Sequence, residues 1–271
     1  MNMSSLNVNI FDLPDEILII IFNKLNNVDL LYSLIGINPK LDKIVCDICF
    51  TKDINLMTIS PNDTSDSRFN AMVDRFHTQI LPRIHNNVES LSIQASLLQR
   101  ILHSNNYPNL HKLNLEMDMA FHIFNKKSLF IRAYKHQISH LTMTLTDISC
   151  NKSTEITIGQ TYVAIFSWLS NLQYLDLDSI DGNLYSRRLL SGLSPTRCYS
   201  STVAHLRIRI HNFDDCLCLL DGRLRQLHTL IVKLDYVRYS RIIINNEVKN
   251  STIEGKLFHF KICWSSCINI M

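Results

Sequence analysis

Hydrophobic residues near the N-terminus are spaced as in a short helix rather than a strand. After Pro14 and the acidic pair Asp15 and Glu16, an uninterrupted apolar run extends from Ile17 to Phe22. Proline is favourable in the first helical turn, and carboxylates are favourable at the positive end of the helix dipole. The helical period predicts one apolar stripe, with Ile19 and Ile20 on the other side, made of Ile17, Leu18, Ile21, Phe22 and Leu25. Because a helix that is apolar nearly all round must be buried nearly all round, we expect one face to pack internally and another against a second protein.

Two further helices are predicted directly after the first. Asn27 or Asp29 can cap a second helix that ends at Gly36, and its apolar positions are Leu30, Leu31, Leu34 and Ile35. Asn38 can cap a third helix with Pro39 at its first position, and the apolar positions there are Leu41, Ile44 and Val45. The sequence therefore predicts three short helices in succession.

In order and spacing these residues resemble the F-box family over residues 11–50. The matching pattern is Leu13-Pro14-x-Glu16-Ile17-Leu18-x-x-Ile21-Phe22-x-x-Leu25, followed by Asp29-Leu30-Leu31. The resemblance implies a three-helix motif that binds the Skp adaptor and, through it, a cullin-type ubiquitin ligase. It implies that the adaptor contact and its support come from Leu13, Pro14, Ile17, Leu18, Ile21, Phe22, Leu25 and Leu30. The alternative is a helical hairpin that docks on the rest of its own chain.

A different pattern recurs from residue 88 onward: apolar, two free positions, apolar, one free position, apolar. Its instances are Val88-Leu91-Ile93, Leu110-Leu113-Leu115, Ile138-Leu141-Met143, Leu172-Leu175-Leu177, Val203-Leu206-Ile208, Leu227-Leu230-Val232 and Leu257-Phe260-Ile262. Helical segments separate most of them, such as Leu97-Leu98-Ile101-Leu102, Tyr162-Ile165-Phe166-Leu169 and Leu217-Leu220-Leu224. Repeated strand–helix units predict a solenoid, because each unit buries its apolar side only by stacking on its neighbours.

The repeated core resembles the leucine-rich repeat over residues 88–262. We therefore expect an α/β fold in which a three-helix F-box is followed by an irregular leucine-rich-repeat-like solenoid with a curved parallel sheet. The expected division is a disordered N-terminus at 1–10, the F-box at 11–50, a linker strand, loop and helix at 51–87, and the solenoid at 88–271.

Residues between the core positions of each strand should point away from the core and form a polar concave wall. The later strands carry more basic side chains than the earlier ones, which suits an acidic or phosphorylated partner. The expected target-binding residues on this wall are Tyr174, Asp176, His205, Arg207, Arg209, Lys233, His259 and Lys261. The alternative is that exposed strand positions carry charge only for solubility.

Composition narrows the class of protein. The chain has 271 residues, of which 46% are hydrophobic and 19% charged, so a globular protein with a substantial core is expected. Its net charge of +3 is too small to favour nucleic acid as a partner. The N-terminus lacks a basic-then-apolar signal, and the longest apolar run has six residues, so we expect no membrane span and an intracellular location, cytoplasmic or nuclear.

The cysteine and histidine patterns do not favour metal chemistry. Of eight cysteines, the pairs Cys46/Cys49, Cys216/Cys218 and Cys263/Cys267 each lack a second pair at ligand spacing, so reduced thiols and no metal or other cofactor are expected. His140, His205 and His259 each precede a core position, which could suggest a metal or pH-sensing column, but repeat divergence explains their recurrence equally well.

No catalytic motif is visible in the sequence. The six glycines are single and form no phosphate loop, and neither a G-x-S-x-G turn nor H-E-x-x-H occurs. We therefore expect a non-catalytic substrate-receptor subunit that binds the Skp adaptor through the F-box and a target protein through the solenoid. The alternatives are a protein-interaction scaffold that does not act in ubiquitination, and an unrelated helical and β domain in which the motif arose by chance.

Overall fold

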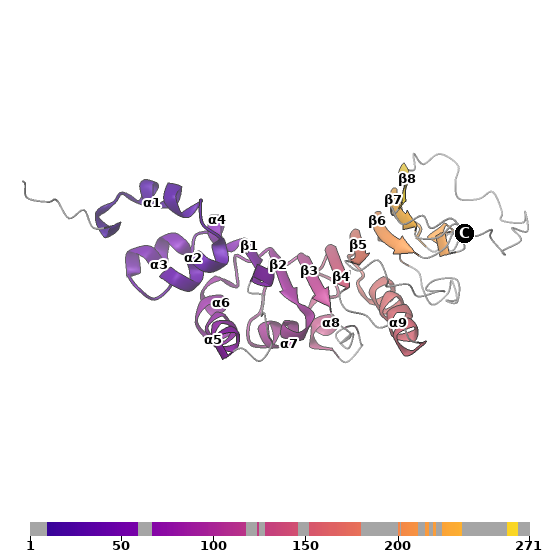
Figure 1. The fold of residues 1–271 in the computed structure, drawn as a ribbon, viewed down its shortest axis with the longest axis horizontal. Helices are drawn as coiled ribbons and strands as arrows, with labels where there is room; N and C mark the ends of the chain where they lie inside the picture. The colour runs from indigo at the N-terminus through magenta and orange to yellow at the C-terminus, as the bar shows by residue number, and fades with distance from the viewer. Residues whose placement is uncertain are drawn as a thin grey trace, which may run out of the picture. The chain divides into compact units, whose positions relative to one another are not determined.

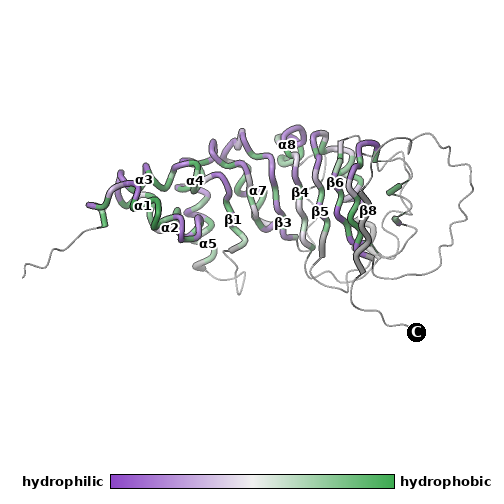
Figure 2. Tube along the Cα trace, turned by 90° about the horizontal axis from the view of Figure 1, so that it is seen from above, coloured by the Kyte–Doolittle hydropathy of each residue, from purple (hydrophilic) through white to green (hydrophobic). Residues whose placement is uncertain are grey.

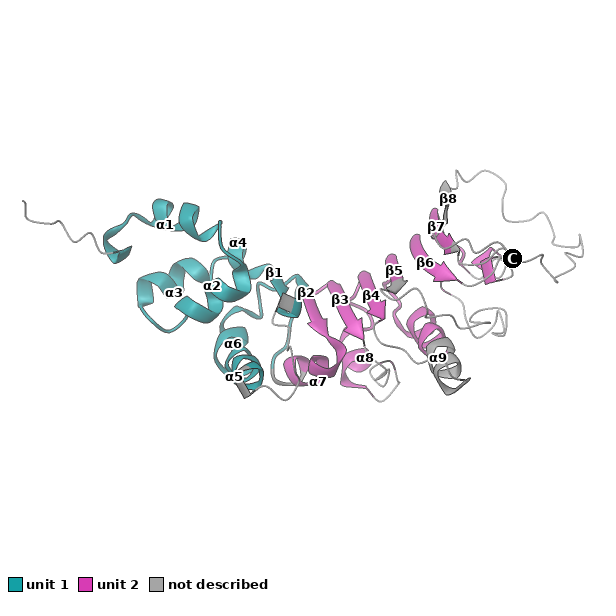
Figure 3. Cartoon of the chain, in the orientation of Figure 1, with its two compact units in different colours: residues 1–91, 104–109 teal, residues 92–103, 110–271 magenta. Residues whose placement is uncertain are grey.

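The computed structural model describes the helices and strands of two compact units (Figures 1 and 3). The residues described are 10–58, 67–117, 124, 128–145, 152–179, 200, 202–210, 215–216, 219–220, 224–234 and 259–264. One unit comprises residues 1–91 and 104–109, and the other comprises residues 92–103 and 110–271. Residues 1–9 of the N-terminal stretch predicted to be disordered, and residues 59–66 of the predicted linker, lie outside the described residues, whereas Ile10 belongs to a 3-10 turn.

Short helices begin the first unit. They are the 3-10 turn η1 (Ile10–Asp12) and the helices α1 (Asp15–Phe22), α2 (Asn27–Leu34), α3 (Pro39–Val45) and α4 (Ile48–Thr51). Asn38 caps α3 as predicted, and Gly36, with φ of 87°, ends α2 in a conformation that favours glycine. Both residues predicted to cap α2, Asn27 and Asp29, were wrong. Asn26 accepts the Val28 and Asp29 N–H groups, because Asn27 and Asp29 already lie in the first turn.

A strand and a long interrupted helix complete the first unit. The strand β1 (Asp53–Asn55) leads into the 3-10 turn η2 (Leu56–Thr58), and the helix consists of α5 (Ser67–Arg75), the π-helical segment η3 (Phe76–Ile80) and α6 (Leu81–Ile84). Pro82, which lacks an N–H donor, lies in the first turn of α6. The π-helical segment η3 therefore comes directly before the turn that contains this proline. Phe76, Ile80 and Leu81 are fully buried and hold the interrupted helix in place.

The described strands form one sheet whose order follows the chain from β1 to β8. Seven strands after β1 are β2 (Ser90–Gln94), β3 (Lys112–Met117), β4 (His140–Leu145), β5 (Tyr174–Ser179), β6 (His205–Ile210), β7 (Thr229–Leu234) and β8 (His259–Trp264). Every pairing from β3 to β8 is parallel. The prediction of an α/β fold with a parallel sheet is therefore confirmed.

Helices connect several of these strands. They are α7 (Ala95–Ser104), α8 (Leu129–Tyr134) and α9 (Lys152–Trp168), and Figure 1 shows them along one side of the strands. The first two apolar segments predicted between strands fall on α7 and α9, except that Leu169 directly follows α9. Leu217 of the third segment lies outside the described residues. Parallel neighbours need such crossovers, because a tight turn cannot join them.

The core of the sheet follows the predicted spacing. The central residue of each repeat is at most 1% exposed from β2 to β7, at Leu91, Leu113, Leu141, Leu175, Leu206 and Leu230. Side chains alternate between this core and the opposite face, and Figure 2 shows the strands from β3 to β8 running side by side. The side chains of β8 lie outside the described residues, so the seventh repeat is placed by its backbone alone.

One backbone arrangement recurs at the start of successive strands. The His111 carbonyl accepts the N–H groups of both Ser139 and His140, and the Ser139 carbonyl accepts those of Gln173 and Tyr174. The carbonyls of Lys52, Gln173 and Ala204 each accept two consecutive N–H groups in the same way. The sequence intervals between strands vary, yet the strand entries share one geometry, which keeps the buried residues in register.

Candidate protein-interaction sites

The helix α1 exposes a group of isoleucines to solvent. Ile17, Ile20 and Ile21 are 42%, 59% and 40% exposed, and they lie on one face because residues three and four apart are neighbours on a helix. Leu18 and Phe22 are 0% and 3% exposed and form the inward face. The single stripe predicted from the sequence was therefore wrong: it combined residues of the two faces and left out Ile20.

A contact with a later helix sets this orientation. The rings of Phe22 and Phe50 meet edge to face with their centroids 6.4 Å apart, and Phe50 is fully buried. Turning Phe22 toward Phe50 also turns Leu18 inward, because the two residues are one helical turn apart. Ile17, Ile20 and Ile21 remain on the outside, and we call these three residues the α1 docking face.

The eight residues expected at an adaptor contact separate into two groups. Pro14, Ile17, Ile21 and Leu25 are exposed and Leu13 is partly exposed, whereas Leu18, Phe22 and Leu30 are buried in the first unit. The buried three can support an interface but cannot touch a partner without unfolding. Ile20 is the most exposed residue of the docking face, and it was not among the eight expected residues. Its spacing of three residues from Ile17 could have placed it on the same face of the helix.

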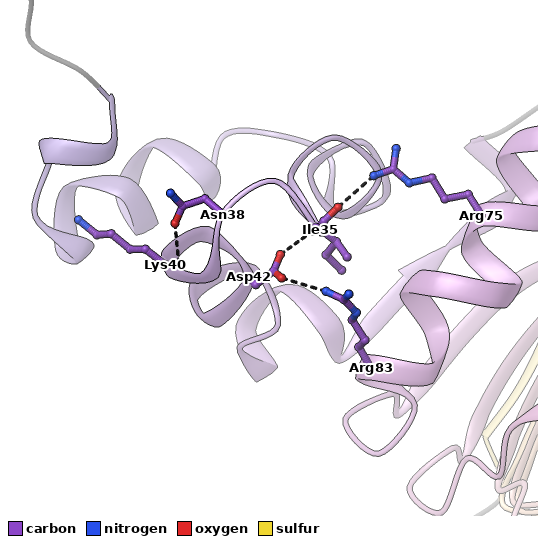
Figure 4. Close-up of polar contacts among 7 residues, drawn as sticks. Ile35, Asn38, Lys40, Asp42, Arg75 and Arg83 are labelled. Carbon is purple, nitrogen blue, oxygen red and sulfur yellow. Dashed lines mark hydrogen bonds and ion pairs between the residues drawn. The ribbon is translucent and has the colours of Figure 1, made fainter.

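Lys40 of α3 holds the segment that leads into α1. Its Nζ donates to the carbonyl oxygens of Phe11 at 3.0 Å and Leu13 at 2.7 Å, and it lies 3.5 Å from Oδ1 of Asp15. Figure 4 shows the Lys40 side chain extending away from α3 toward this segment. The sequence pattern did not indicate this residue, since its partners are mostly backbone carbonyls.

Two arginines from the interrupted helix contact α3 and the turn that precedes it (Figure 4). Arg83 donates to Oδ2 of Asp42 at 2.9 Å, while Oδ1 of Asp42 accepts the Gly36 N–H at 2.6 Å. Arg75 donates to the Ile35 carbonyl at 3.0 Å and lies 4.6 Å from the centre of the Tyr32 ring. These contacts link the helices α2 and α3 to α5 and α6 within the first unit.

On the second unit the structure brings three of the predicted target-binding residues together. Asp176 lies between Tyr174, which is two residues earlier on β5, and Arg207, its register partner on β6. Arg207 Nη1 is 3.4 Å from Asp176 Oδ2, and Asp176 is only 7% exposed, so it lies beneath the surface of this face rather than on it. Burial, followed by the negative charge of Asp176, raises the pKa of Tyr174, so this hydroxyl stays protonated.

The other predicted residues extend along the same face of the strands. His205 is exposed, and Arg209 and Lys233 are partly exposed register partners on β6 and β7. His259 and Lys261 lie opposite Thr229 and Ile231 in the backbone register of β8, and their side chains lie outside the described residues. We call the face formed by Tyr174, Asp176, His205, Arg207, Arg209 and Lys233 the polar wall.

Aromatic and imidazole rings continue this wall toward β3. The His140 ring stacks on Tyr174 at 5.7 Å and meets His111 edge to face at 6.4 Å. Burial lowers the pKa of His140, and the positive charges of Lys112, His111 and His205 lower it further. His111 was not predicted, because it immediately precedes the strand rather than alternating within it.

Cys46, Cys49 and Cys216 are free thiols. Burial and the charge of Asp215 raise the pKa of Cys216 to about 11. Burial and the Asp47 carboxylate likewise raise the pKa of Cys49 to about 11. Both thiols therefore stay protonated near neutral pH, which makes them poor nucleophiles. Within the part of the chain that is described, no cluster of three or more His, Cys, Asp or Glu side chains could hold a metal ion.

Comparison with known proteins finds no protein-family model and no curated protein that matches the chain. The candidate sites therefore rest on the residues and geometry described above. Across the helices that are described, none has both the length and the apolar character needed to cross a membrane.

Proposed function

We propose that the chain is a substrate-receptor subunit of a cullin-type ubiquitin ligase, with an F-box formed by α1, α2 and α3. In this proposal the α1 docking face binds a Skp-type adaptor, and the polar wall binds a target protein. The chain is non-catalytic. It contributes by tethering, since holding a target near a ubiquitin-loading enzyme raises its effective concentration and orients it.

The exposure of Ile17, Ile20 and Ile21 is the observation that carries the proposal. Single apolar residues on a surface are common, but three on one face of an eight-residue helix form a contiguous patch. Leu18 and Phe22 already supply the inward contacts of α1, so the three isoleucines are available to a partner. The F-box resemblance of residues 11–50 supports a Skp-type adaptor as that partner.

The polar wall supports an acidic or phosphorylated target. Arg209 and Lys233 are register partners on adjacent strands, so two basic side chains lie side by side on the polar wall. A carboxylate or phosphate of a partner could accept charge-assisted hydrogen bonds from them. Asp176 holds Arg207 beside this pair, which fixes the position of a third basic group.

The adaptor assignment is tested by Ile20→Glu, measured as co-purification of a Skp-type adaptor with the full chain. Burying a new carboxylate at an apolar interface is expected to lower adaptor recovery at least about tenfold. Leu129→Glu is the matched control, because Leu129 is 41% exposed on α8 in the other unit and should leave recovery unchanged. Undiminished recovery with Ile20→Glu would contradict the docking face.

Recovery of a cullin with the adaptor separates the two functions considered for this chain. A ligase subunit should retain both the adaptor and the cullin, and both should be lost together in Ile20→Glu. Recovery of the adaptor without a cullin would instead favour an interaction scaffold that does not act in ubiquitination.

A further inference from the structure

The start of α1 differs from the starts of the three helices that follow it. Within residues 10–58, a side chain from the preceding residue caps α2, α3 and α4, namely Asn26, Asn38 and Asp47. The residue before α1 is Pro14, and no side chain caps the helix there. A helix of eight residues is marginal in isolation, so its entry must be fixed by tertiary contacts.

Lys40 supplies such contacts from a residue far along the chain. Its ammonium donates to two carbonyls of the entry segment, those of Phe11 and Leu13, and also faces the carboxylate of Asp15. An ammonium has three N–H donors, so one lysine can satisfy all three oxygens at once. Bonds from a charged donor are stronger than those between neutral groups, which makes this a firm attachment of the entry segment to α3.

We propose that Lys40 is a positioning residue for the α1 docking face. Leu18 and Phe22 anchor the middle and the end of α1, and Lys40 anchors its beginning. With both ends fixed, Ile17, Ile20 and Ile21 are presented in one orientation before a partner arrives. This inference rests on the proposed function, because it assigns Lys40 a role in the same docking event.

The physical basis is preorganisation. A partner that binds an already ordered helix avoids the entropy cost of ordering it, and that saving appears directly in affinity. Without the Lys40 ammonium, the Phe11 and Leu13 carbonyls would be solvated and the first turn of α1 would open more often. Binding would then require closing that turn again.

The test uses the full chain with Lys40→Met, Lys40→Arg and Lys43→Met. Lys43→Met is the matched control, because Lys43 lies on the same helix, carries the same charge and is exposed. Affinity for a purified Skp-type adaptor is measured by calorimetry. Amide hydrogen exchange of residues 10–22 in the free protein is measured separately, and thermal unfolding confirms that each variant is folded.

Lys40→Met removes both charge-assisted hydrogen bonds to the entry segment, so it is expected to weaken adaptor binding at least about tenfold, which is the effect of losing one such bond. Exchange of the Ile17 and Leu18 amides, which donate to the Pro14 carbonyl, should accelerate in the same variant. Lys40→Arg should recover part of both effects because it restores a charged donor. Lys43→Met should change neither measurement.

Lys40→Met behaving like Lys43→Met in both measurements would overturn the inference. Faster exchange with unchanged affinity would overturn it too, because Lys40 would then fix α1 without serving the docking face. Failure of the unaltered chain to bind the adaptor would instead refute the proposed function, and with it the role of Lys40 in docking. The exchange data would still show whether Lys40 holds the helix entry.

Discussion

The two candidate surfaces of this chain present opposite chemistry. On α1, apolar side chains that could have been buried remain in solvent while the helix is anchored by Leu18 and Phe22. On the sheet, apolar side chains are enclosed and the alternate positions carry Tyr174, Asp176 and Arg207. In the proposed function, the first surface therefore binds by desolvation and the second by charge and hydrogen bonding.

The largest loss of stability is expected from a charge placed in the buried core of the sheet. Leu175→Asp would place a carboxylate at a fully buried position of β5, and burying an unpaired charge is costly enough to prevent the second unit from folding. Circular dichroism and amide spectra should show loss of the sheet. Thr229→Asp is the matched control, because Thr229 alternates to the polar wall, where its register partners are histidines. A folded sheet in Leu175→Asp would show that β5 does not bury this face.

The next largest loss of stability should distinguish the buried face of α1 from its exposed face. Leu18→Ala should lower the free energy of unfolding by about 2–4 kcal/mol, because it removes a fully buried side chain. Ile20→Ala should change it by no more than about 0.5 kcal/mol, as is usual for an exposed position. Denaturant unfolding measures both. Equal losses would mean that Ile20 is covered by its own chain, which would remove the docking face.

A smaller effect is expected at the Asp176–Arg207 pair. Asp176→Asn keeps the shape of the side chain but removes its charge. Because the Asp176 side chain is 10% exposed while that of Arg207 is 40% exposed, stability should fall by about 1 kcal/mol, the upper end of the range for surface ion pairs. The pKa of Tyr174 should move down toward its ordinary value, because the carboxylate is one cause of its elevation. A spectrophotometric titration of the phenol measures this shift, and Arg207→Lys, which keeps both charges, should change it less.

The sheet could be predicted from the sequence because its pattern is redundant. Leu113, Leu141 and Leu175 occupy equivalent places in repeated units, and each unit needs its neighbours to bury that residue. A mistake in assigning one strand would be recognised, because the same pattern recurs in the next repeat. The alternation along each strand then fixed which residues lie on the polar wall.

The orientation of α1 could not be predicted in the same way. Apolar residues surround α1, so no polar face indicated which side of the helix turns inward. The inward side is set by the contact of Phe22 with Phe50, a residue from a later helix. The short helix α4 was also missed, although Asp47 caps it, because four residues are too few for a periodic signal. The role of Lys40 could not be predicted from the sequence, because it bonds to backbone carbonyls, which every residue has.

The smallest effect concerns the charge of His140, which stacks on Tyr174 at the edge of the polar wall. Because the folded state lowers the pKa of this imidazole, the unfolded chain binds its proton first, and stability should fall as pH decreases below 6.5. Lys112→Gln should raise the pKa of His140, since a neighbouring positive charge is removed. An NMR titration of the ring protons measures the change, and Lys135→Gln, which removes a charge that does not affect His140, is the control. If the pKa of His140 were the same in Lys112→Gln and Lys135→Gln, the charge of Lys112 would not be a cause of its low value.

A His140 that stays neutral near pH 7 also bears on what the wall can bind. A neutral imidazole stacked on Tyr174 offers a ring face and its Nε2 atom rather than a positive charge, because Nδ1 lies 2.9 Å from Ser139 Oγ. The basic groups then begin with Arg207 on β6 and continue to Arg209 and Lys233. A partner lying across the wall would meet rings at one end and cations at the other, so its apolar or aromatic residues and its acidic residues would have to occupy separate segments.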